Sequence, residues 1–450
     1  MRGFQKDVIA KYLKAYAEPE AAFGTRLQCH TEHVLVIPAQ DESISLLEGI
    51  QPALDTVSEQ GQRALCIIVV NATDTHGSFV QNRNTELIHA LRDHGPTVPL
   101  HIQNETPCWY TRASGFDLVV VDRNSTGFRL PSNQGVGLAR KIGCDLALTA
   151  LRDGSNRSPL IHMTDCDVRL PSNYFDVAVP AACAALIYRF SHKPSGHSLI
   201  DDAHAKYEAF LRYYVLGLQH AGSPYAFHTI GSCIAVTPTA YAAVRGVPKR
   251  QAGEDFYLLN KLAKVGGLYT ASTAPLAIQA RTSLRVPFGT GQATNEIMQK
   301  SDAYKIYNPT VFDLLKAWCS ALKAINGTTA NAAYETVVSR AESGLDPVDQ
   351  QRLGKALEVI GAPNALMTAA AQSPINVIRQ KWLTDWFDAF RTLKLVHALR
   401  QTGLPDIPWF QALQNASFSR SAVANARPEH RTTTDTFDIC QRLASLEEQC

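Results

Sequence analysis

The sequence predicts an α/β protein: a mostly parallel sheet with helices on both faces, joined to an α-helical C-terminal region. Three observations lead to this fold class. Short apolar runs alternate with amphipathic helical stretches over the first 300 residues. Those runs are continuously apolar, as in "ALCIIVV" at 64–70, which is typical of strands buried on both faces. Beyond residue 300, strand patterns give way to helical ones.

The elements follow one another in a strand–helix alternation. The first apolar run, "HVLVIP", is followed by a stretch with apolar residues at helical spacing, and the pattern then repeats. The predicted strands are 33–38, 64–70, 116–121 and 160–164, and the predicted helices are 43–59, 85–94 and 135–151.

The last third of the chain is predicted to be helical. Residues 311–325, 352–362 and 381–400 carry apolar residues at helical spacing, and core packing is the favoured explanation for them. The expected organisation is therefore an N-terminal helical extension over 1–30, an α/β domain over 31–300, and a helical domain over 301–450 with a flexible tail.

Composition narrows the class of protein. The chain has 450 residues, 45% of them hydrophobic and 19% charged, with a net charge of +2. This length favours two or three domains, and the balanced charge argues against nucleic acid as the main partner. Ten cysteines are scattered without a C-x-x-C pair, which favours reduced thiols and a cytoplasmic location. We expect no signal peptide and no transmembrane segment.

Polar residues follow each predicted strand, where an open α/β sheet binds its ligands. The sharpest case is Asp165-Cys166-Asp167 after the strand 160–164. In extended chain, residues i and i+2 face the same side, so the two carboxylates can share a hard cation such as Mg²⁺ or Mn²⁺. A solvated turn is the alternative explanation.

Two helix starts also carry charged groups. Gly135 to Lys141, "GVGLARK", opens a helix with glycines and a cationic pair, which suits a phosphate. Glu254-Asp255 precedes the apolar "FYLLNKL". These acids can supply a general base, or they can simply stabilise the helix dipole.

The chain resembles glycosyltransferases of the GT-A fold, family-2 type. The resemblance covers about residues 31 to 290 and rests on six stretches in order: "VLVIPAQDE", "IIVVNATD", "GVGLARKIGCD", "LIHMTDCDVRLPSNYF", "TIGSCIAV" and "AGEDFYLLNKLAKVGGL". It implies a nucleotide-diphospho-sugar donor, a divalent metal (Mg²⁺ or Mn²⁺) and a D-x-D motif.

The resemblance also implies roles for individual residues. Asp167 would bind the metal, with Asp165 close to the metal or the ribose. Asp255 would be the catalytic base, with Glu254 as the second choice. The remaining donor-binding candidates are Pro38, Ala39, Asp41, Glu42, Asn71, Asp74, Arg140, Lys141, Gly231 and Ser232. The family often has Asp-Asp or Asp-Gly at the end of the second strand, where this chain has "VNATD".

Arginines and histidines further along are additional candidates. Arg281 and Arg285 lie near the glycines and the proline of "VPFGTG", and either could bring a guanidinium to a diphosphate or pair with surface acids. His192, His197 and His228 are possible extra metal ligands.

Two other functions remain open at this point. The stretch "LIHMTDCDV" loosely fits a haloacid-dehalogenase-like phosphatase or phosphotransferase, with Asp165 as nucleophile and Asp167 as acid. At least three strands precede it, whereas that type carries the motif on its first strand. The chain could also be a non-catalytic nucleotide-sugar-binding protein. The donor base and sugar, the acceptor, the stereochemical outcome and the oligomeric state are open.

Overall fold

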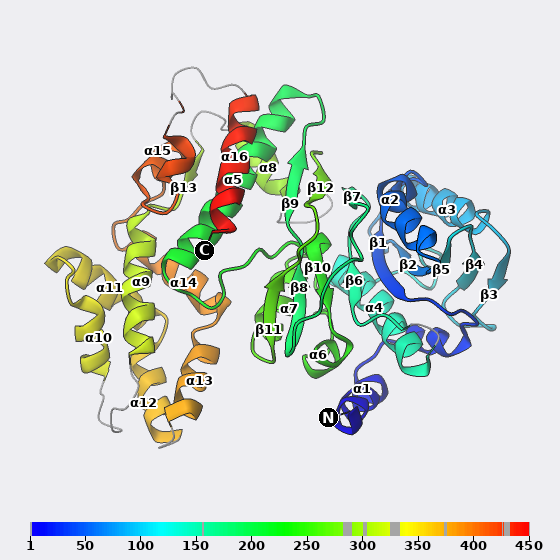
Figure 1. Ribbon diagram of the computed structural model, residues 1–450, viewed down its shortest axis with the longest axis horizontal. Coiled ribbons are helices and arrows are strands. Elements are labelled where there is room, and N and C mark those ends of the chain that lie inside the picture. The colour runs from blue at the N-terminus through cyan, green and yellow to red at the C-terminus, as the bar shows by residue number, and fades with distance from the viewer. Residues whose placement is uncertain are drawn as a thin grey trace. The chain divides into compact units, whose positions relative to one another are not determined.

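The computed structural model describes residues 2–154, 157–281, 290–299, 304–324, 334–372, 376–424, 426 and 433–449. The chain divides into two compact units (Figure 1). The first comprises Met1–Ser195 and Thr229–Gln292, and the second comprises Gly196–His228 and Ala293–Cys450. The segment 1–30 thus belongs to the first unit. The segment 196–228, which the sequence placed in the α/β domain, groups with the C-terminal helices.

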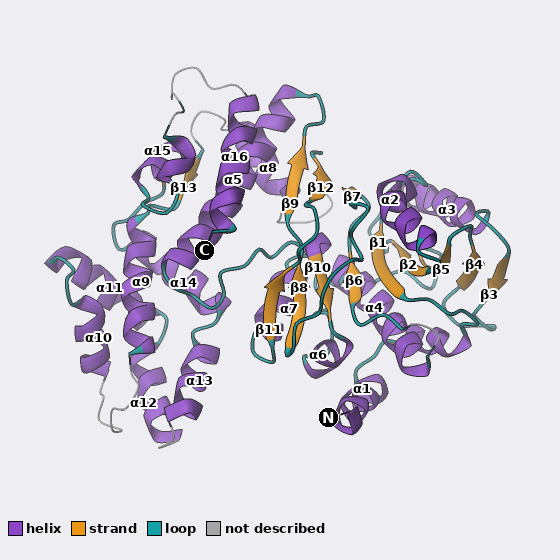
Figure 2. Ribbon diagram, viewed as in Figure 1, coloured by secondary structure: helices purple, strands orange, loops and turns teal. Residues whose placement is uncertain are grey.

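The first unit is built on a nine-stranded mixed sheet (Figure 2). The strand order is β11-β8-β10-β6-β1-β2-β5-β4-β3. The strands are β1 (His33–Ala39), β2 (Ala64–Asn71), β3 (Thr97–Pro99), β4 (Cys108–Arg112), β5 (Phe116–Arg123), β6 (Ile161–Met163), β8 (Cys183–Ile187), β10 (Ile234–Val236) and β11 (Gly267–Thr270). A smaller sheet has the order β7-β12-β9, with β7 (Val168–Arg169), β9 (Phe190–Lys193) and β12 (Leu276–Gln279).

The α/β class is confirmed, and the expected parallel pairing holds at the centre of the sheet. Strands β6, β1, β2 and β5 are parallel neighbours, and the predicted strand segments coincide with them to within two residues. Strands β3, β4 and β10 pair antiparallel with their neighbours on either side of this centre. Every residue of β2 is buried, as its continuously apolar sequence predicts.

Helices cover both faces of the parallel strands. In Figure 1, α2 (Leu46–Glu59) and α3 (Ser78–Arg92) lie on one side of the sheet and α4 (Gly135–Asp153) on the other. Helix α3 begins seven residues before the predicted helix 85–94. The other helices of this unit are α1 (Arg2–Ala15), α6 (Pro238–Ala243), α7 (Glu254–Leu262) and the 3₁₀ helices η1 (Pro19–Arg26) and η2 (Gly231–Cys233).

The strand order creates a switch point beside β1. The chain runs outward from β1 to β2 and β5, and then returns to form β6 on the other side of β1. Connections that leave β1 and β6 therefore diverge to opposite sides at the carboxyl ends of these two strands. In open α/β sheets the crevice outside such strand ends is where ligands bind.

The second unit is helical, with one short strand pair, β13 (Lys305–Ile306) and β14 (Ile407–Pro408). Its core gathers large apolar side chains, including the fully buried Trp318, Phe312 and Tyr213. Its helices are α5 (Ser198–His220), α8 (Thr290–Gln299), α9 (Thr310–Lys323), α10 (Tyr334–Glu342), α11 (Pro347–Val359), α12 (Ala362–Gln372), α13 (Asn376–Trp386), α14 (Ala389–Gln401), α15 (Trp409–Asn415), η4 (Arg420–Val423) and α16 (Thr433–Glu447).

Two details of the C-terminal region differ from the sequence-based expectation. The stretch 381–400 is divided between α13 and α14, because Asp388 caps α14 by accepting a hydrogen bond from the backbone N–H of Arg391 (3.1 Å). The expected flexible tail is "ARPEHRTTTDT", residues 426–436, but its residues 433–436 begin α16 (Thr433–Glu447), which packs on α5. Residues 427–432 of that tail lie outside the described residues.

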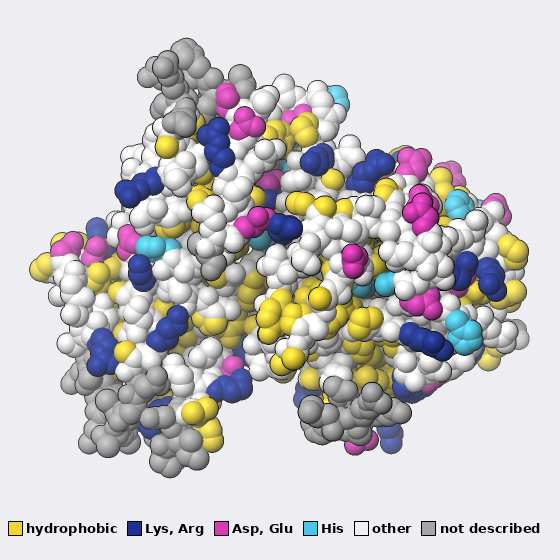
Figure 3. Space-filling model, viewed as in Figure 1, with side chains coloured by type: hydrophobic (Ala, Val, Ile, Leu, Met, Phe, Trp, Pro, Cys, Tyr) yellow, Lys and Arg dark blue, Asp and Glu magenta, His cyan; other side chains and the backbone are white. Residues whose placement is uncertain are grey.

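The surface carries both charge signs. On the face shown in Figure 3, Lys and Arg side chains are interspersed with Asp and Glu. In the described part of the chain, no helix is both long enough and apolar enough to cross a membrane. The nine described cysteines are free thiols, seven of them buried.

Candidate functional site

The carboxyl ends of β1 and β6 and the start of α7 bring carboxylates together. Glu42 follows β1, Asp165 and Asp167 follow β6, and Glu254 and Asp255 begin α7. Two arginines form ion pairs with these carboxylates: Arg140 in the first half of α4, and Arg281 just beyond the end of β12. These seven side chains form what we call the switch-point cluster, and its ion pairs define its geometry.

Arg140 joins the end of β6 to the start of α7. Its Nη2 donates to Asp165 Oδ1 across 2.8 Å, and its Nε donates to Glu254 Oε1 across 3.3 Å. The arginine side chain is only 3% exposed. Its Nη1 is buried and has no hydrogen-bond partner within the described part of the chain. A buried guanidinium held by two carboxylates is a fixed charge, and one of its donors has no acceptor among the described residues.

Arg281 pairs with one carboxylate after β1 and one after β6. Its Nε donates to Asp167 Oδ2 and its Nη2 pairs with Glu42 Oε1, both across 2.8 Å. The arginine lies two residues beyond the end of β12, and the backbone N–H of Gln279 in β12 donates to the carbonyl of Asp167. Unlike Arg140, Arg281 is one-third exposed. Arg285 lies outside the described residues.

The acidic pair that opens α7 holds its protons tightly. Burial, together with the nearby Glu254 carboxylate, raises the pKa of Asp255 to about 7. Burial also raises the pKa of Glu254, against the opposing effect of Arg140. A carboxyl group with a pKa near 7 is suited to exchange a proton at neutral pH.

Gly231 lies beside the Arg140 guanidinium and the Asp255 carboxyl group. A Cβ atom placed there would stand 2.9 Å from Arg140 Nη2 and 3.5 Å from Asp255 Oδ2. A glycine therefore keeps a small space open next to the guanidinium and the acid. The neighbouring Ser232 is buried.

The negative charges of the switch-point cluster outnumber the positive ones. Five carboxyl groups face two arginines, and burial raises the pKa of Asp167 despite its pairing with Arg281. An excess of neighbouring carboxylates over cationic side chains favours an additional cation. Over the described ranges, no three His, Cys, Asp or Glu side chains are grouped as a ready-made metal site. Asp165 and Asp167 nevertheless offer the hard oxygen donors that Mg²⁺ and Mn²⁺ take, and substrate phosphates commonly complete such sites.

The polar residues at the ends of β1 and β2 bond to one another and to α3, and so stabilise the two strand ends. Asp41 has a left-handed backbone (φ 53°) and donates its N–H to Asn84 Oδ1, while its carboxylate pairs with Arg83. The buried Asn71 donates to the carbonyl of Ala39. These contacts hold the two strand ends at the edge of the crevice, next to the buried Pro38 and Ala39. Asp74 is 82% exposed and lies 3.8 Å from Arg129.

Lys141 lies apart from the switch-point cluster. Its Nζ donates to Asp145 Oδ2 (2.6 Å) and to the hydroxyl of Tyr12 in α1 (2.7 Å). Tyr12 and Tyr241 both donate to Asp145 Oδ1. Adjacent residues on a helix point in different directions, so Arg140 and Lys141 serve different clusters. Lys141 anchors the N-terminal helix.

The glycines that open α4 serve packing. A Cβ atom at Gly137 would lie within 2.5 Å of the carbonyl oxygen of Pro248, and the Gly137 N–H donates to the carbonyl of Arg250. These residues therefore let the segment 248–251 pass close to the helix. The suggestion that "GVG" binds a phosphate gains no support from these contacts.

The sequence reasoning missed Asn84 and Asp145. Asn84 is fully buried and contacts the ends of β1 and β2, and Asp145 is the centre of the Tyr12–Lys141 cluster. A polar residue at an otherwise apolar helix position was the available signal in both. His197 and His228 belong to the second unit, where His228 pairs with Glu447. His192 is buried in β9.

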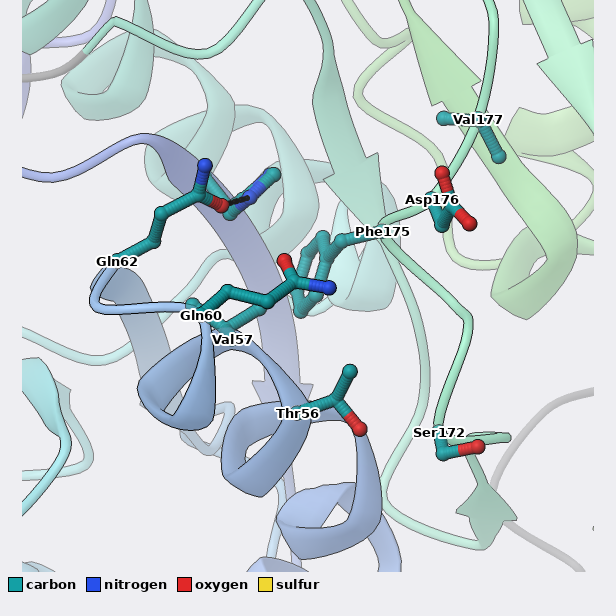
Figure 4. A pocket seen from close by; sticks show the side chains of 9 residues that line it. Thr56, Val57, Gln60, Gln62, Ser172, Phe175, Asp176 and Val177 are labelled. Carbon is teal, nitrogen blue, oxygen red and sulfur yellow. Dashed lines mark hydrogen bonds between the residues drawn. The ribbon is translucent and has the colours of Figure 1, made fainter.

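A pocket of about 210 Å³ lies at the opposite, amino-terminal end of β1 (Figure 4). His33, Gln60, Gln62, Phe175 and Asp176 are among its lining residues. Because His33 begins β1 and Glu42 follows its last residue, this pocket is separate from the switch-point cluster.

No protein-family model matches this chain, and no curated protein matches it in sequence. The fold and the switch-point cluster are therefore the basis for any functional conclusion.

Proposed function

We propose that this protein is a metal-dependent glycosyltransferase of the GT-A type, which moves a sugar from a nucleotide-diphosphate donor to an acceptor hydroxyl. One observation carries the proposal. The ends of β1 and β6, at the switch point of the sheet, bring Glu42, Asp165 and Asp167 together with the acidic pair of α7.

The division of charge within the cluster supports this reaction. Asp165 and Asp167 would hold a Mg²⁺ or Mn²⁺ ion, which when bound supplies positive charge against the leaving diphosphate. Glu42, Asp41 and the strand-end residues Pro38, Ala39 and Asn71 would line the nucleoside side of the crevice. Gly231 and Ser232 would lie next to the transferred sugar, where a side chain at 231 would meet Arg140 and Asp255.

Asp255 is the proposed base. It would accept the proton of the acceptor hydroxyl as oxygen attacks the anomeric carbon, and its raised pKa allows that exchange near neutral pH. Arg140 would act as a positioning residue, since it fixes the metal-side carboxylate Asp165 and the acidic pair with one guanidinium. Its unpartnered Nη1 is available to an oxygen of the bound donor.

The phosphatase alternative is not favoured by any observation. It needs Asp165 as a free nucleophile, but this carboxylate accepts a hydrogen bond from the buried Arg140. The non-catalytic alternative is addressed directly by the experiment below. A cytoplasmic location remains a prediction.

A thermal-shift panel of UDP-, GDP- and other nucleotide sugars, with and without Mn²⁺, tests the proposal. A ligand at 100 times its Kd stabilises the folded state by about 2.7 kcal/mol. We expect a metal-dependent shift with at least one donor, followed by metal-dependent release of its nucleoside diphosphate. Asp176→Asn is the matched control, because Asp176 is an exposed carboxylate nine residues beyond Asp167. A panel without any metal-dependent shift contradicts the proposal, and binding without release identifies a non-catalytic protein.

A further inference from the structure

The two arginines of the switch-point cluster are held differently. Arg140 is 3% exposed, lies within α4 and bridges two acids at the floor of the cluster. Arg281 is 33% exposed and lies beyond the last residue of β12. Its guanidinium spans the crevice at the switch point, with Glu42 of the β1 end on one side and Asp167 of the β6 end on the other.

The position of Arg281 conflicts with a cation on Asp167. Asp167 Oδ2 already accepts a hydrogen bond from Arg281 Nε at 2.8 Å. A divalent ion bound to the same carboxylate would place two positive groups within a few ångströms of each other. Arg281 therefore has to leave Asp167, or the ion has to bind weakly.

A diphosphate would resolve this conflict. Its oxygens accept the paired donors of a guanidinium at least as well as a carboxylate does. Arg281 is sufficiently exposed to turn away from Asp167, whereas Arg140 is enclosed by its two acids. An incoming diphosphate could thus take Arg281 while the cation takes Asp167.

We propose that Arg281 is an internal counter-cation: it occupies Asp167 and Glu42 in the free protein, competes with the divalent ion for Asp167, and transfers to the diphosphate when the donor binds. This inference rests on the proposed function, because it assumes a metal and a diphosphate at this crevice. It makes metal binding and diphosphate binding mutually favourable, since each ligand removes an obstacle to the other.

The test is a pair of titrations on Arg281→Gln and on the wild-type chain. Mn²⁺ affinity is measured by electron paramagnetic resonance without any phosphate, and the affinity for inorganic pyrophosphate is measured by calorimetry at saturating Mn²⁺. Loss of a partly exposed ion pair changes affinity by roughly fivefold. We expect Arg281→Gln to bind Mn²⁺ about fivefold more tightly and pyrophosphate about fivefold more weakly. A residue that only supports the fold would shift both affinities in the same direction.

Arg83→Gln is the matched control. Arg83 pairs with Asp41 at the same strand end, so this variant loses the same charge without touching Asp167. Its Mn²⁺ affinity should stay within about twofold of wild type. Unchanged Mn²⁺ binding in Arg281→Gln, weaker Mn²⁺ binding, or an equal gain in Arg83→Gln overturns the inference.

A second variant covers the case in which Arg281→Gln does not fold. Arg281→Lys keeps the charge but loses the fork that reaches both acids, so its Mn²⁺ affinity should exceed that of wild type by a smaller factor. Equal affinities in Arg281→Lys and wild type would then refute the inference. The glycosyltransferase proposal and the counter-cation role of Arg281 can be refuted independently of each other. If a nucleotide sugar stabilises the wild type with Mn²⁺ while Arg281→Gln leaves both affinities unchanged, only the counter-cation role is lost.

Discussion

Arg140 and Glu254 are 114 residues apart in the chain, yet the guanidinium Nε donates to the Glu254 carboxylate across 3.3 Å while its Nη2 holds Asp165. One buried side chain thereby fixes the relative positions of the D-x-D motif and the acidic pair. The predictions below concern what each of these groups contributes.

Asp255→Asn should lower the single-turnover rate by about 10² to 10⁴ while donor affinity stays nearly unchanged, because a general base typically contributes that factor. The rate and the donor Kd are measured on the same preparation, with Glu254→Gln as the comparison. If Glu254→Gln loses the rate and Asp255→Asn keeps it, the two roles are exchanged. If neither variant loses rate, a retaining mechanism without this base is the better explanation.

The pH dependence of the rate should follow Asp255. A base with a pKa of about 7 is roughly one-tenth ionised at pH 6, so the rate there should be about tenfold below its plateau at higher pH. The rate–pH profile from pH 5 to 9 checks this. A flat profile between pH 6 and 8 would exclude Asp255 as the titrating group.

The same group should make the protein less stable as the pH rises. Burial raises the Asp255 pKa above its unfolded value, so between about pH 4 and 7 the folded chain binds more protons than the unfolded chain. Stability then falls with rising pH over this interval. At pH 8, Asp255→Asn should therefore melt roughly 2–4 °C above wild type. An equal or lower melting temperature would contradict the assignment of this pKa.

Asp167→Asn should abolish transfer and the metal-dependent part of nucleotide-sugar binding, because a neutral amide cannot replace the charge of a metal ligand. Asp165→Ala should weaken both and leave some response to metal. The donor thermal shift with and without Mn²⁺ measures each effect, and Asp176→Asn should behave as wild type. Full activity in Asp167→Asn would remove this residue from the metal site.

Substitutions of the neighbouring cations Arg140 and Lys141 on α4 should differ in their effect on donor binding. Lys141→Met removes the partner of the buried Asp145 and should cost about 3–5 kcal/mol of stability without changing the donor affinity of the folded fraction. Arg140→Met should cost a similar amount and should also weaken donor binding. Urea unfolding and donor titration at low temperature separate the two. Equal loss of donor affinity in both variants would place Lys141 at the donor site.

The sequence was informative where periodicity is strong. The buried strands β1, β2 and β5 and the helices α2 and α4 appear where their apolar patterns predict them. The short strands β3, β7 and β9 were not predicted, because two to four residues carry too little pattern. The return of β6 to the far side of β1 is a long-range choice that no local pattern encodes.

The candidate site was predictable in part for the same reason. Asp165 and Asp167 were recognisable because they end a buried strand, and Glu254-Asp255 because they begin a helix. Which arginine meets which acid depends on the fold, so Arg140 and Lys141 could not be separated from sequence alone. The capping role of Asp388 was visible only once the break between α13 and α14 was known.

The packing of α16 on α5 sets an order of events during synthesis. Helix α5 ends at His220, and its partner α16 ends at Glu447, so about 230 further residues must leave the ribosome before the pair can form. At roughly 5–20 residues per second this takes about 10–45 s. Throughout that interval Arg212 of α5 lacks its partner Glu447, and the face that α16 covers is open to water. A nascent chain of this protein therefore exposes the face of α5 that α16 covers until α16 itself has been synthesised.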